Sequence, residues 1–204
     1  MCYDYKTSVI SFIIPMTVVS LMLYRGSKYD YYLAPLVFIY SLVQLGEAII
    51  WKNLNNKNLN LLGSKIILIS LALNAFGLGL GIYINNKNIY PMLIGLLIGI
   101  YFIINRWNMK MTKKNKKGNL QWGFSFNFYM IIFALTLYYL FITDISLSEK
   151  ILTSIFFIIT CIYYVFYQYI YLKNKSGGTL WCNVAAFSSF LFLIIPYIKS
   201  FFIQ

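Results

Sequence analysis

The chain contains no histidine and only five acidic residues among its 204. Without histidine there is no Ser-His or Cys-His nucleophile activation and no histidine-based zinc site. Of the acids Asp4, Asp30, Glu47, Asp144 and Glu149, Glu47 alone falls within a long apolar run, which leaves no carboxylate pair inside such a run for acid–base catalysis. The three cysteines show neither metal-binding nor redox spacing. We therefore expect no enzymatic activity, no cofactor and no metal site.

Charged residues of both signs are also scarce. They make up 11% of the chain, against 60% hydrophobic residues and a mean hydropathy of +0.71, whereas a soluble domain carries about 25% charged residues. So few charges do not cover the surface of a water-soluble globule. The net charge of +12 is spread over short polar connections, so the positive-inside bias of membrane proteins explains it and we expect no nucleic-acid partner.

Apolar runs of bilayer length recur along the whole chain. Each approaches the ~20 residues that a helix needs to cross the hydrocarbon layer. The first run is not followed by the small-residue cleavage site of a signal peptide, so we retain it as a span. The pattern predicts an all-α, polytopic transmembrane bundle, a single domain of residues 1–204 with seven spans at about 8–24, 31–51, 61–84, 89–105, 122–143, 149–172 and 180–203.

Most of the 17 lysines and arginines fall on the side of these spans that holds the N-terminus. The positive-inside rule puts this side in the cytoplasm, with the N-terminus inside and the C-terminus outside. The four tryptophans fall at the same interface, where Trp side chains anchor spans at headgroup level; they are Trp51, Trp107, Trp122 and Trp181.

The loop from Arg106 to Lys117 is the long basic connection of the chain. We expect it to act as a topological anchor, and a second, compatible interpretation is contact with anionic lipid headgroups, to which each basic residue near the surface contributes about 1 kcal/mol. The expected partners are therefore the bilayer and anionic lipids. The sequence leaves the oligomeric state open.

Glu47 is the ionisable residue inside a predicted span, a position that is costly and that faces protein or water rather than lipid. Gln44 and Trp51 lie on the same helix face. We expect Lys65, at similar depth on the next antiparallel helix, to pair with Glu47; alternatively Lys65 extends to the headgroups and leaves Glu47 protonated. Polar residues of the same half of the bundle complete a set of ligand- or ion-binding candidates, namely Gln44, Glu47, Lys65, Asn127, Gln168 and Asn183.

Small residues recur at a spacing of four in two predicted spans, Gly77 with Gly81 and Gly95 with Gly99. Glycines at this spacing let helix backbones approach closely. Because a short turn joins the two spans, we expect the glycines to pack within one chain rather than between two chains.

Two motifs, Gln44-x-x-Glu47-x-x-x-Trp51 and Gly178-Thr179-Leu180-Trp181-Cys182, resemble those of an uncharacterised family of multi-span membrane proteins of giant DNA viruses and some protists. The resemblance implies a viral or host membrane and carries no activity with it. Two hypotheses follow. One is a structural or interaction component of a viral or host internal membrane. The alternative is a transporter or channel for a small solute or ion that uses Glu47 as its proton or cation site.

Overall fold

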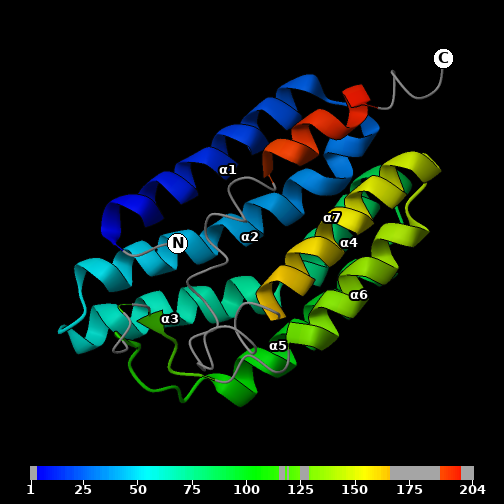
Figure 1. The fold of residues 1–204 in the computed structure, drawn as a ribbon. Helices are drawn as coiled ribbons and strands as arrows, with labels where there is room; N and C mark the ends of the chain where they lie inside the picture. Colours follow the sequence, from blue (N-terminus) through cyan, green and yellow to red (C-terminus); the bar gives the residue numbers. More distant parts are fainter. Residues whose placement is uncertain (1–3, 115–117, 119, 125–128, 166–188, 199–204) are drawn as a thin grey trace.

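The computed structural model describes residues 4–114, 118, 120–124, 129–165 and 189–198, and these are mostly helical (Figure 1). The all-α part of the prediction is confirmed. A two-stranded antiparallel hairpin lies between the helix that ends at Arg106 and the helix that begins at Tyr129. The elements are α1 (Tyr5–Arg25), α2 (Lys28–Lys52), α3 (Lys57–Ala72), α4 (Asn74–Asn86), α5 (Tyr90–Arg106), β1 (Lys113–Lys114), β2 (Leu120–Gln121), α6 (Tyr129–Ile142), α7 (Leu147–Val165) and a further helix, Ser189–Ile198.

Capping residues fix where α1 and α2 begin and end. The Asp4 side chain accepts a hydrogen bond from the Thr7 amide at 2.8 Å and opens α1, and Gly26 closes it with a φ of 65°, a left-handed conformation that glycine adopts without a Cβ clash. Ser27 and Asp30 then form a reciprocal capping box that starts α2. The two helices are thereby joined by a tight turn and run antiparallel.

Two helices, α1 and α2, are long and apolar enough to cross a membrane. Helices α3 and α4 together also meet this test, but they bend by 50° at Leu73, so they count as a third span only if the broken pair is taken as one. Helices α5, α6 and Ser189–Ile198 are apolar and shorter. The described part of the chain thus holds two or three helices able to span a bilayer.

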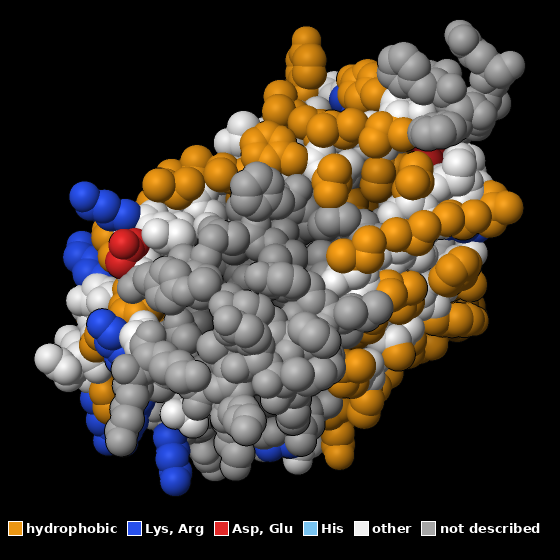
Figure 2. Space-filling model, in the orientation of Figure 1, with side chains coloured by type: hydrophobic (Ala, Val, Ile, Leu, Met, Phe, Trp, Pro, Cys, Tyr) orange, Lys and Arg blue, Asp and Glu red, His pale blue; other side chains and the backbone are white. Residues whose placement is uncertain are grey.

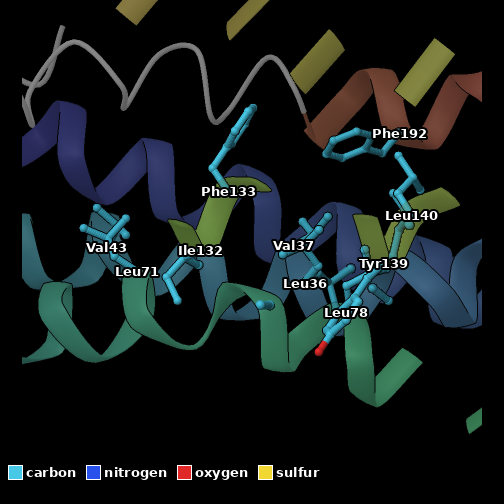
Figure 3. Close-up of a cluster of buried hydrophobic side chains, with 14 of the residues drawn as sticks. Leu36, Val37, Val43, Leu71, Leu78, Ile132, Phe133, Tyr139, Leu140 and Phe192 are labelled. Carbon is cyan, nitrogen blue, oxygen red and sulfur yellow. The ribbon is translucent and has the colours of Figure 1, made fainter. Parts of the chain in front are cut away.

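Helix α2 lies at the centre of the bundle and packs against α1, α3 and α4. Its buried side chains meet those of α3, α4, α6 and the last helix in one apolar cluster (Figure 3). Within lipid, such helices are held by van der Waals packing rather than by exclusion of water. Ten members are labelled in that view: Leu36, Val37, Val43, Leu71, Leu78, Ile132, Phe133, Tyr139, Leu140 and Phe192.

The glycines pack within the chain, as expected, but not all against the expected helix. A Cβ at Gly95 would meet the α4 backbone at Phe76 at 2.7 Å, so α5 does pack on α4 through its glycines. Gly77 and Gly81 face α2 instead, where a Cβ at Gly81 would clash with the Tyr32 backbone. Gly79 is the α4 residue on which the start of α5 rests, a Cβ there falling 2.7 Å from Met92 N.

Lysine and arginine side chains gather at one end of the molecule, and hydrophobic side chains spread over the opposite end and the adjoining flank (Figure 2). The start of α1, the α2–α3 connection and the β1–β2 hairpin lie at that end in Figure 1, and we call it the basic end. One helix start differs from the prediction: α6 begins at Tyr129, and Trp122 lies in the loop after β2. Parts of the last two predicted spans, 166–172, 180–188 and 199–203, lie outside the described residues.

Candidate functional site

Glu47 is fully buried near the C-terminal end of α2. The indole Nε1–H of Trp122 donates a hydrogen bond to Glu47 Oε1 at 3.3 Å. Trp122 follows β2, and its ring stacks on Phe124 with centroids 5.7 Å apart. The carboxylate inside the bundle is therefore bound by the loop that covers the basic end.

Gln44 and Trp51 share the helix face that carries Glu47. Gln44, one turn earlier, is also fully buried. Trp51, one turn later, has the Lys114 ammonium of β1 at 5.7 Å from its ring centroid. Two residues of the Gln44-x-x-Glu47-x-x-x-Trp51 motif, Glu47 and Trp51, thus contact the β1–β2 hairpin and the loop that follows it.

The predicted ion pair between Glu47 and Lys65 is wrong. Lys65 Nζ lies over the ring of Trp107, 4.1 Å from its centroid. The reason is the rotation of α3: a Cβ on Gly63 would meet the Gly46 carbonyl of α2 at 2.6 Å, so Gly63 faces α2. At about 100° per residue, Lys65 is turned about 200° away from that contact.

A second polar cluster, which the sequence reasoning missed, ties the hairpin to α3. The Asn60 amide donates to Thr112 O at 3.0 Å and accepts from Thr112 N at 2.9 Å. The Ser64 hydroxyl lies 2.8 Å from Thr112 Oγ1. All three residues are buried. The sequence signal for this cluster was the pair Asn60 and Ser64, which lie four residues apart and therefore on one face of α3.

The described tryptophans differ in exposure and in contacts. Trp107 is exposed and carries Lys65 Nζ over its ring. Trp51 and Trp122 are only partly exposed and contact the hairpin and Glu47. The remaining candidates lie outside the described residues: Asn127, Gln168, Trp181 and Asn183.

The opposite end carries an ion pair that the sequence reasoning also missed. Arg25 Nε donates to Asp30 Oδ2 at 2.7 Å, its Nη2 donates to Asp30 Oδ1, and its Nη1 donates to Leu193 O at 2.6 Å. Asp30 is fully buried and Arg25 is 17% exposed. Tyr197 lies against the guanidinium, its ring centroid 5.1 Å from Arg25 Cζ. This pair therefore fastens the last helix to the α1–α2 turn.

An exposed pair joins the same turn to the α6–α7 connection. Lys28 Nζ lies 2.6 Å from Asp144 Oδ2, with half of each side chain exposed. The Tyr32 hydroxyl also donates to Asp144. Lys28 and Tyr32 hold the pKa of Asp144 well below its usual range, so this carboxylate stays ionised at neutral pH.

No protein-family model, curated protein or solved structure matches this chain. Among the residues that the structure describes, no three His, Cys, Asp or Glu side chains gather as metal ligands would. The chemistry at the basic end is therefore that of a buried carboxylate, an indole donor and surface ammonium groups. Such a set binds protons, cations or anionic groups.

Proposed function

We propose that this chain is a seven-span integral membrane protein with its N-terminus and basic end in the cytoplasm and its C-terminus on the other side. Described helical segments lie within all seven predicted ranges, and two of them, or three if α3 and α4 are taken as one, are long and apolar enough to cross a membrane. These helices support the proposal, and so do the large apolar side chains that stay exposed along the outer helices, because soluble proteins rarely expose apolar patches beyond a few hundred Å². Examples are Ile13, Leu97, Ile104, Ile131 and Ile159, each more than half exposed.

The role we propose is that of a structural or interaction component of a viral or host internal membrane. The observation that carries it is the hydrogen bond from Trp122 to Glu47, because it gives the buried carboxylate a partner inside the fold. A buried polar group with a well-placed partner holds structure together. The viral or host membrane rests on the motif resemblance alone.

Replacing Glu47 separates this role from transport. Glu47→Leu removes the acceptor of the indole N–H of the partly buried Trp122, and we expect it to lower the free energy of unfolding by about 1–3 kcal/mol. Glu47→Gln keeps an acceptor oxygen, so the free energy of unfolding should fall by less. Trp122→Phe, which removes the donor, is the matched variant, and its loss should not add fully to that of Glu47→Leu. Steric trapping in bicelles measures these energies.

Proteoliposomes provide the decisive readout for the same variants. The structural role predicts that wild type and Glu47→Gln both pass protons and monovalent cations no faster than empty liposomes do. A flux carried by wild type and lost in a well-folded Glu47→Gln variant would contradict it. Such a result would favour the second candidate, a transporter or channel. The observation behind this candidate is the full burial of Glu47 and Gln44, because intramembrane carboxylates commonly mark ion and proton pathways.

A further inference from the structure

The β1–β2 hairpin is seated on the bundle by its inner side. We define it as residues 109–114 together with 120–124. Thr112 is held by Asn60 and Ser64, Leu120 is fully buried, and Trp122 donates to Glu47. Lys110 N also donates to Gly123 O at 3.2 Å, which closes the hairpin on itself. These contacts hold the hairpin in one position against α2 and α3.

Its outer side presents lysines. Lys110, Lys113 and Lys114 are exposed, and the ends of α1, α2 and α3 add exposed lysines beside them, Lys6, Lys52 and Lys57. The exposed acid described nearby is Asp4, which caps α1. The surface therefore carries a dense positive charge (Figure 2).

The positions of these ammonium groups favour a lipid as the ligand. Lys52 lies 5.8 Å from the Tyr5 ring centroid, and Lys65 and Lys114 lie over Trp107 and Trp51. Tyrosine and tryptophan sit at headgroup level in membrane proteins. Ile104, just before Trp107 at the end of α5, is 69% exposed, so an apolar surface adjoins the charges.

We propose that the hairpin and the adjoining lysines form a docking surface for anionic phospholipids, with the phosphate-bearing headgroup on the ammonium groups and the acyl chains along the exposed end of α5. A nucleic acid would match the charge but not the adjoining apolar surface. This inference rests on the proposed membrane location and adds a partner to it. Near a surface, a basic residue contributes enough attraction for about a fivefold change in binding.

The test uses the full chain reconstituted in phosphatidylcholine nanodiscs. Tryptophan quenching is compared for brominated phosphatidylserine and brominated phosphatidylcholine at equal mole fraction, since described tryptophans lie at the basic end. The variant is Lys110→Gln/Lys113→Gln, which leaves Lys114 over Trp51 in place. The matched control is Lys87→Gln/Lys150→Gln, which removes the same charge from the opposite end.

We expect phosphatidylserine to quench more than phosphatidylcholine in wild type and in the control. This excess should fall at least about fivefold in Lys110→Gln/Lys113→Gln, and high salt should suppress it. Equal quenching by both lipids in wild type, or an excess that the variant retains, would overturn the proposal. So would binding of a fluorescent DNA duplex through the same two lysines without any lipid preference. Failure of the chain to insert into the nanodisc would instead count against the proposed membrane location.

Discussion

Replacing Arg25 with methionine is expected to lower the free energy of unfolding by about 3–5 kcal/mol. The change leaves the fully buried Asp30 carboxylate without its bidentate partner, and it removes the hydrogen bond to Leu193 O that holds the last helix. Methionine keeps most of the aliphatic volume, so the loss reports the charge rather than a cavity. Steric trapping in bicelles measures it.

Two comparisons make this prediction specific. Arg25→Met/Asp30→Asn removes both charges and should recover part of the loss, because the cost lies in the unpaired buried charge. Lys28→Met breaks the half-exposed pair with Asp144 and should cost no more than about 1 kcal/mol. If Arg25→Met and Lys28→Met lowered the free energy of unfolding equally, the buried Arg25–Asp30 pair would contribute no more to stability than the exposed pair.

Gly81→Val is expected to destabilise the protein by about 3 kcal/mol, the upper end of the usual cost of overpacking. A Cβ at Gly81 would fall 2.7 Å from Tyr32 Cα and closer still to the Tyr32 carbonyl, so α4 must move away from α2 to accept any side chain. Helix α2 is the centre of the packing, and the shift would disturb the cluster around Leu36 and Leu78. The free energy of unfolding again provides the measurement.

Ala134→Val is the matched control for this substitution. Ala134 is exposed on α6, so added methyl groups meet lipid or solvent rather than a helix backbone. We expect it to change stability by less than about 0.5 kcal/mol. A Gly81→Val variant as stable as Ala134→Val would mean that α2 and α4 do not pack as closely as described.

Hydropathy predicts where the helices lie because a helix pairs the backbone N–H and C=O groups of an apolar run within the run itself. It does not predict a break inside a run: α3 and α4 read as one continuous stretch, yet the helix bends at Leu73. Hydropathy also predicts too early a start for α6. Trp122 and Phe124 are as apolar as the helix that follows them, but they lie in a loop.

The polar contacts were predicted in part. Glu47, Gln44 and Trp51 share a helix face by periodicity alone, and that much follows from the sequence. The partner of Glu47, Trp122, could not be predicted from the sequence. It depends on how α3 is rotated and on the loop that returns over the bundle. Depth along antiparallel helices suggested Lys65, whereas the contact between Gly46 and Gly63 turns Lys65 away.

The Arg25–Asp30 pair was missed for a different reason. Both residues lie at the ends of apolar runs, where charges are ordinarily solvated, and burial there depends on the last helix, far away in the sequence. The capping box of Ser27 and Asp30 was a local signal for the helix start. It does not reveal that the same carboxylate is fully buried.

Cysteine accessibility measures the central claim, the alternation of the connections across a membrane. In a variant without native cysteines, single cysteines replace the exposed residues Asn55, Asn88, Lys113 and Leu147, one in or beside each of four successive connections. The account predicts that an impermeant maleimide added to intact cells labels positions 88 and 147, and labels 55 and 113 only after permeabilisation. Labelling of neighbouring connections from the same side, or the reverse pattern, would contradict it.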